Sequence, residues 1–218
     1  MDTNRKEIID KVVSLYSRVG WKKLFARGRF WYAPYIEVEQ LVPKNGKIID
    51  LGCGEGILTN YLGLASENRR VLGLDVDKKR IKEANRGVKN VSFKLNDITK
   101  VKIPPCDGII IFQVLHHLSS HKIQEEVIKN CVESLKQGGK LIITEIYVGF
   151  SINYFLTWIA DHLLVAWFFE KRIYSPILFR KLDSWIRIIK ENGLSYNIIS
   201  PNSITKPFSN TIIECIKQ

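Results

Sequence analysis

The 218-residue sequence has few cysteines, and their positions give no sign of a metal or disulfide framework. The four cysteines lie far apart, and no two of them form a CxxC or CxxH pair. We therefore expect no bound metal and no disulfide bonds, and a reducing, cytoplasmic location fits best. The first 13 residues carry charges where a secretory signal would have an apolar core, which argues against export.

Long runs of one residue type are also lacking. The net charge is +11, but the basic residues are spread along the chain without a polybasic block. This charge favours anionic partners, either nucleic acid or a membrane surface, and is explained equally well as an aid to solubility. The most apolar segment, residues 146–169, is uncharged for only 15 residues before Asp161, whereas a membrane span needs about 20. The segment is therefore not predicted to cross a membrane.

The distribution of apolar residues predicts an α/β fold. Residues 1–46 have helical spacing and form an expected N-terminal helical cap. From Lys47 onward, short β-rich runs alternate with polar helical stretches, a pattern typical of a parallel sheet buried on both faces. Residues 194–199 and 211–216 are joined without a helix, which predicts an antiparallel edge hairpin. We expect a mostly parallel, seven-stranded sheet in a domain of residues 47–218, with a helical insert at about 147–181.

The most informative stretch is a glycine-rich turn after the first expected strand. The run from Asp50 to Gly56 reads DLGCGEG, a Gly-x-Gly-x-Gly turn before a helix. Glycines there permit a tight turn and let a ligand approach the backbone closely. The spacing differs from the G-x-G-x-x-G of dinucleotide binders.

Acidic residues follow at the ends of the next two expected strands. The second strand ends at Asp75, about where an acid would contact the ribose of an adenosine-containing cofactor, and the third ends in Asn96-Asp97-Ile98. Ligands of open α/β sheets bind at this carboxyl edge. Together with Asp50, these acids suit a neutral or cationic ligand better than a pyrophosphate.

These motifs resemble those of the class I S-adenosylmethionine-dependent methyltransferases over residues 47–146 and, more loosely, the terminal hairpin. The resemblance implies a Rossmann-like methyltransferase fold and S-adenosyl-L-methionine as cofactor. It implies that Gly52 and Gly54 line the methionine portion, that Asp50 holds the loop and the methionine amino group, and that Asp75 binds the ribose hydroxyls. By the same resemblance Val76 packs on adenine and Asp97 accepts from its amino group. The expected cofactor-binding set is Asp50, Gly52, Cys53, Gly54, Gly56, Asp75, Val76, Asn96, Asp97, Ile98 and Gln113.

The fourth expected strand ends in the sequence VLHHL, which resembles the version common among small-molecule methyltransferases. In this family, that position faces the transferable methyl group. The protein must align the acceptor and, for a protonated nucleophile, remove one proton, a task that suits a histidine. His116 and His117 are candidates, and the alternative for each is a residue that caps or packs beneath the site. Glu145 and Tyr147, near the end of the fifth expected strand, are further catalytic candidates.

Two segments outside the sheet are candidates for covering the site. Arg27, Arg29, Trp31 and Tyr32 precede the sheet, where an arginine could pair with the cofactor carboxylate and an aromatic ring could close over it. The apolar insert points to a hydrophobic or lipid-like acceptor, and its content serves equally for a homodimer interface or peripheral contact with a membrane.

The sequence therefore predicts a methyltransferase that acts on a small, hydrophobic molecule. An RNA methyltransferase is the first alternative; the charge favours it, but the chain lacks the Asn/Asp-Pro-Pro-aromatic motif. The second alternative is a non-catalytic cofactor-binding or membrane-associated scaffold.

Overall fold

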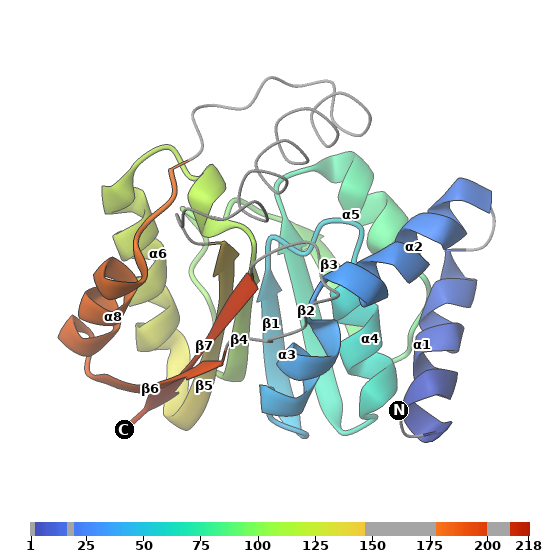
Figure 1. Ribbon diagram of the computed structural model, residues 1–218, viewed down its shortest axis with the longest axis horizontal. Coiled ribbons are helices and arrows are strands. Elements are labelled where there is room, and N and C mark those ends of the chain that lie inside the picture. The colour runs from blue at the N-terminus through green and yellow to red at the C-terminus, as the bar shows by residue number, and fades with distance from the viewer. Residues whose placement is uncertain (1–2, 17–19, 147–177, 200–209) are drawn as a thin grey trace.

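The computed structural model describes residues 3–16, 20–146, 178–199 and 210–218 as a twisted sheet with helices on both faces (Figure 1). The order of the seven strands is β3-β2-β1-β4-β5-β7-β6. The strands are β1 (Gly46–Leu51), β2 (Arg69–Asp75), β3 (Val91–Leu95), β4 (Cys106–Phe112), β5 (Leu135–Ile146), β6 (Leu194–Ile199) and β7 (Asn210–Lys217).

The sheet is parallel except at the hairpin. Strands β1 to β5 pair in parallel, whereas β7 runs antiparallel to both β5 and β6. Strand β7 inserts between β5 and β6, so β6 forms the outer edge. The predicted fold class, a mostly parallel seven-stranded sheet with an antiparallel edge hairpin, is confirmed.

Among the described residues, three helices precede the sheet, in the segment expected to be helical. They are α1 (Thr3–Leu15), α2 (Gly20–Tyr32) and α3 (Tyr35–Leu41). The later elements are the helices α4 (Ile57–Ala65), α5 (Lys78–Ala84), α6 (His121–Ser134) and α8 (Leu182–Glu191) and the short 3-10 helix η1 (Leu115–His117). No described helix is long and apolar enough to span a bilayer. The predicted insert lies outside the described residues, apart from its last four positions.

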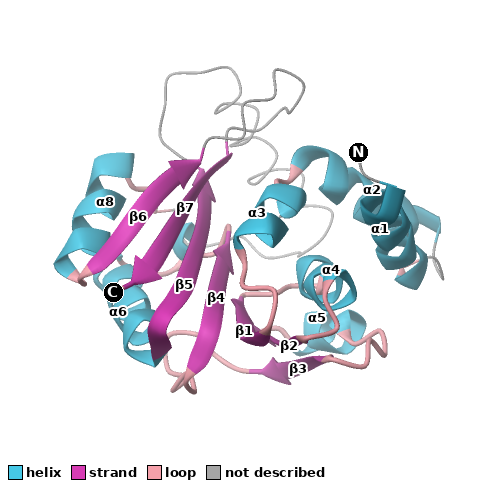
Figure 2. Cartoon of the chain, turned by 90° about the horizontal axis from the view of Figure 1, so that it is seen from below, coloured by secondary structure: helices cyan, strands magenta, loops and turns pink. Residues whose placement is uncertain are grey.

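Two hydrophobic layers enclose the sheet, because side chains alternate between its faces. On β1, Ile48 packs with α1, α3 and α4 on one face, whereas Ile49 and Leu51 pack with α6 and α8 on the other. Figure 2 shows these two groups of helices on opposite sides of the strands. All three side chains are fully buried, which explains the continuous apolar character of the run.

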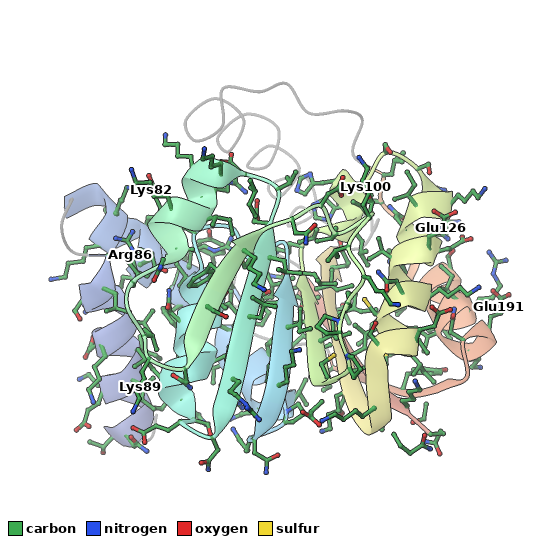
Figure 3. The ribbon with its side chains drawn as sticks, turned by 180° about the vertical axis from the view of Figure 1, so that it is seen from behind. Lys82, Arg86, Lys89, Lys100, Glu126 and Glu191 are labelled. Carbon is green, nitrogen blue, oxygen red and sulfur yellow. The ribbon has the colours of Figure 1, made fainter. Side chains whose placement is uncertain are left out.

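The second face is only partly covered. Residues 96–105, which connect β3 to β4, contain no helix. Seen from behind, β3 and β2 therefore lie without a helix over them, while α6 and α8 cover the β4–β5 side (Figure 3). Ser92 and Lys94 on β3, which project from this face, are exposed as a consequence.

Candidate active site

The glycine turn joins the end of β1 to α4, and its glycines have different roles. A Cβ at Gly56 would lie 2.8 Å from Phe93, so packing within the domain requires this glycine. A Cβ at Gly54 would meet only the end of Arg80, at 4.0 Å. Because Gly54 borders open space and has no side chain, a ligand can approach its backbone closely, as a cofactor-binding turn requires.

Asp75 connects the glycine turn to the next strand. Its side chain is 6% exposed and accepts hydrogen bonds from the backbone N–H of Gly54 and of Asp77, both at 2.8 Å. The backbone N–H of Asn96 in turn donates to the carbonyl oxygen of Asp75 at 2.9 Å. The ends of β1, β2 and β3 therefore meet, as expected for the carboxyl edge of a parallel sheet.

Beyond β3, the residues expected to hold adenine lie along the same edge. Asp97 accepts hydrogen bonds from the N–H and hydroxyl of Thr99 at 2.9 and 2.7 Å. Slight burial alone would raise the pKa of Asp97, but these bonds and nearby Lys100 lower it below its usual value, so the carboxylate stays an acceptor. Ile98 is buried and Val76 is 71% exposed, which leaves the Val76 side chain accessible.

Asp50 is a buried carboxylate at the end of β1. It is 2% exposed and accepts a hydrogen bond from the Thr59 hydroxyl at 2.6 Å. Burial raises its pKa to about 6, opposed by the bond from Thr59 and assisted by the negative charge of Asp75. A cationic group of a ligand would stabilise the ionised form.

A buried pair of side chains joins the ends of β4 and β5. Glu145 Oε2 lies 2.5 Å from His116 Nδ1, and Glu145 Oε1 accepts from the backbone N–H of Leu115 at 2.9 Å. His116 and Glu145 are each 2% exposed, and the Phe179 ring stacks on His116. A carboxylate facing Nδ1 favours the tautomer with the proton on that atom, which makes Nε2 the basic nitrogen.

Gln113 stands between the glycine turn and this pair, in an uncommon backbone conformation. Its φ of +54° lies in the left-handed region, which non-glycine residues adopt rarely and mostly where surrounding structure holds them. Its backbone N–H donates to the Thr144 carbonyl, and its side-chain amide donates to Asn210 Oδ1 at 2.6 Å. The bonds to β5 and β7 hold Gln113 at the site.

A pocket of about 160 Å³ lies where these elements converge. Of the predicted site residues, those that line it are Asp50, Gly52, Cys53, Gly54, Gln113, His116 and His117. Gly56, Asp75, Val76, Asn96, Asp97, Ile98 and Glu145 are not among its described lining, and Tyr147 lies outside the described residues. Burial raises the pKa of the Cys53 thiol, so this cysteine is not an activated nucleophile.

Helix α2 supplies one wall of the pocket. Phe25, Arg29 and Tyr32 line it, whereas Arg27 pairs with Asp10 on α1 and Trp31 is 62% exposed. Tyr35 and Phe112, which the sequence did not mark as site residues, extend this wall. The spacing of four and then three residues from Phe25 to Tyr32 is the sequence signal for one helical face.

Arg29 is held among aromatic rings. Its guanidinium donates to the hydroxyls of Tyr35 and Tyr32 at 2.8 and 3.0 Å and lies near the ring of Phe112. In the part of the chain that the structure describes, no carboxylate forms an ion pair with Arg29. A guanidinium in this position can receive an anionic group of a ligand.

The sheet order and the glycine turn define a Rossmann-like methyltransferase fold, and comparisons with known proteins agree. Residues 48–139 match the family model described as a methyltransferase domain. The chain is 27% identical over 180 residues to the mitochondrial ubiquinone biosynthesis O-methyltransferase of Bos taurus, covering 75% of this chain and 45% of that protein. It is 32% identical over 119 residues to (S)-coclaurine N-methyltransferase of Thalictrum flavum subsp. glaucum, covering 51% and 32%.

A solved structure supports the fold over nearly the whole chain. The TehB-like SAM-dependent methyltransferase of Corynebacterium glutamicum matches with a TM-score of 0.62 at 18% identity, covering 91% of this chain and 94% of that one. This protein spans less than half the length of the curated relatives named above. The resemblance found in the sequence is confirmed over residues 48–139, which match the methyltransferase domain, and the fold of nearly the whole chain is similar to that of a solved S-adenosylmethionine-dependent methyltransferase.

Proposed function

We propose that this protein transfers the methyl group of S-adenosyl-L-methionine to a small, hydrophobic acceptor molecule. The observation that carries the proposal is the pocket at the carboxyl edge of the sheet, whose lining brings the glycine turn and His116 together. Both of the named relatives are, by their names, methyltransferases of small-molecule pathways or substrates, one at oxygen and one at nitrogen. They support the substrate class and leave the acceptor atom open.

The residues present fit the cofactor. The open space beside Gly54 accommodates a ligand, and the carboxylate of Asp50 suits the cofactor's ammonium group. Arg29 suits its carboxylate, while Asp75 would bind the ribose hydroxyls. When bound, S-adenosyl-L-methionine supplies an electrophilic methyl group attached to a sulfonium.

The adenine end would lie along the neighbouring strand ends. The exposed side chain of Val76 supplies apolar surface there, whereas Ile98 is buried in the core, and the carboxylate of Asp97 can accept a hydrogen bond from an amino group. Asn96 lies close to the end of β2 because its backbone N–H donates a hydrogen bond to the backbone carbonyl of Asp75.

The acceptor would lie against the aromatic wall and His116. The rings of Phe25, Tyr32, Tyr35 and Phe112 offer it an apolar surface, which favours a hydrophobic molecule. His116 Nε2 would take the proton of the attacking group, with Glu145 holding the ring through Nδ1 and stabilising the cation that forms. The further expectation of a lipid-like acceptor rests on the insert of residues 147–181, of which residues 147–177 lie outside the described residues.

The proposal is tested by incubating the protein with labelled S-adenosyl-L-methionine and cell extract, followed by separation of lipid, polar small-molecule and RNA fractions. We expect label in an extractable small molecule. Label in RNA alone would contradict the proposal, as would cofactor binding without transfer to any fraction.

Variants then assign the residues. We expect His116→Gln to lower turnover about 100-fold or more while retaining cofactor binding, because general-base catalysis contributes about 10²–10⁴-fold. Arg29→Gln should weaken cofactor binding, whereas Arg27→Gln, on the same helix but paired with Asp10, should not. Normal turnover in His116→Gln would remove this residue from the mechanism.

A further inference from the structure

A second concave site lies on the uncovered back face of the sheet, away from the methyltransferase pocket. This cavity of about 590 Å³, here called the back-face groove, shares no described lining residue with that pocket. Its charged lining residues are Lys47, Arg70, Lys89, Lys94, Asp107 and Lys136. Figure 3 shows the uncovered strands and labels Lys89 near their lower ends.

The sheet register gathers these charges. Lys47 on β1 pairs with Arg70 on β2, and Lys94 on β3 pairs with Leu74. Partners in neighbouring parallel strands project from the same face at a spacing of about 4.8 Å. Leu74 and Ile49 belong to the buried layer behind the sheet, so Lys47, Arg70 and Lys94 all project from that face. The connection of residues 96–105 contains no helix that would cover them.

The positive charge of the groove is only partly neutralised from within. Asp107 accepts hydrogen bonds from Lys136 Nζ at 2.8 Å and from the backbone N–H of Lys47 at 2.7 Å. The bond from Lys136, the bond from the Lys47 backbone and the nearby charges of Lys136 and Arg70 lower the pKa of Asp107, so this single carboxylate remains ionised among several cations. Among the described residues, Arg70 and Lys94 form no ion pair. Like charges gathered in this way repel one another unless an anion binds.

We propose that the back-face groove binds the phosphate groups of a small, soluble polyphosphate ligand. Its volume falls within the range of about 300–1,000 Å³ typical of small-molecule sites. Arginine and lysine together are the usual ligands of phosphate oxygens. The described lining contains no phenylalanine, tyrosine or tryptophan on which the bases of single-stranded RNA could stack, which favours a small ligand over RNA.

Calorimetric titration with inorganic tripolyphosphate tests this site directly. We expect micromolar binding at about 0.05 M salt that weakens at about 0.3 M, as screening requires. The double variant R70Q/K94Q should weaken binding about tenfold or more and leave cofactor affinity unchanged, which also shows that the variant is folded.

The matched control is K11Q/K122Q, which removes the same charge from exposed positions on α1 and α6. Equal weakening by the control would overturn the proposal, because binding would then follow total charge. Absence of tripolyphosphate binding at low salt would also overturn it. The proposal would also be overturned if tripolyphosphate does not bind and a single-stranded RNA or anionic phospholipid vesicles bind through Arg70 and Lys94 instead. The readout is independent of methyl transfer, so failure of one proposal leaves the other standing.

Discussion

The ionisation of Asp50 gives the proposed cofactor site a predictable pH dependence. Burial raises the pKa of this carboxyl to about 6, and the bond from Thr59 keeps it from rising further. If the ionised carboxylate binds the cofactor's ammonium group, affinity should follow the ionised fraction of Asp50 in the free protein. That fraction is about nine-tenths at pH 7 and about one-tenth at pH 5, so we expect the affinity to fall about tenfold, or about 1.4 kcal/mol.

The same shift predicts how stability without cofactor depends on pH. The folded-state pKa of Asp50 lies above the value of 3.8 for an unperturbed carboxyl. Between these values the folded protein holds a proton that the unfolded chain has lost. The contribution of Asp50 to the free energy of unfolding therefore falls as the pH rises from about 4 to about 6, by about 3 kcal/mol in total.

The assay is a calorimetric titration with S-adenosylhomocysteine, the demethylated cofactor, from pH 5 to pH 8. We expect Asp50→Asn to bind more weakly at pH 7 and to lose the dependence near pH 6. Thr59→Val removes a bond that favours the ionised form, so it should move the midpoint to higher pH. A flat wild-type profile between pH 5 and pH 7, or an unchanged slope in Asp50→Asn, would refute the reasoning; the second result would point to the pocket histidines instead.

Three further predictions concern the glycine turn. Gly54→Val should abolish cofactor binding measured by calorimetry while the protein still folds. Gly56→Ala should lower the melting temperature more, because its Cβ collides with packed side chains in addition to the strain that the positive φ causes at both positions; equal loss of stability in both would contradict the distinction. Asp75→Ala should weaken cofactor binding by about 1.5–3 kcal/mol, measured by the same titration, and unaltered affinity would rule out its ribose role. Tyr16→Phe removes the hydroxyl that donates a hydrogen bond to the Glu55 carbonyl at 2.7 Å. The free energy of unfolding measured by denaturant titration should therefore fall by about 1–3 kcal/mol, and an unchanged midpoint would show that the bond contributes nothing.

The sheet and the glycine turn could be predicted because their signals are local. Apolar strands separated by helical stretches indicate a parallel sheet, and Asp50 to Gly54 are consecutive in the chain. The buried face of helix α2 is harder to predict from the sequence, because basic and aromatic residues interleave in GWKKLFARGRFWY and obscure the apolar face. Arg29 and Tyr32 were candidates from the sequence alongside Arg27 and Trp31, and only the orientation of the helix separates the pocket-lining pair from the other two.

The pairing of His116 with Glu145 depends on strand adjacency, which no local pattern reveals. Both were candidates, but they are 29 positions apart. They meet because β4 lies beside β5 with Phe112 opposite Thr144, so the end of β5, which contains Glu145, lies beside the residues that follow β4 at the carboxyl edge. A register shifted by one residue would turn Glu145 to the opposite face of the sheet. The geometry of the proposed base is therefore a property of the β4–β5 register.

The position of the basic residues in the fold also depends on strand register. In the sequence, the lysines and arginines are spread along the chain and form no block. The register of β1, β2 and β3 nevertheless brings Lys47, Arg70 and Lys94 onto one face, and the connection of residues 96–105 leaves that face without a helix. A helix at this connection would bury the face, and burying unpaired charges would cost several kcal/mol for each ion. These charged side chains therefore require a face that no helix covers. A sequence without a polybasic run can thus still form a concentrated basic surface when it folds.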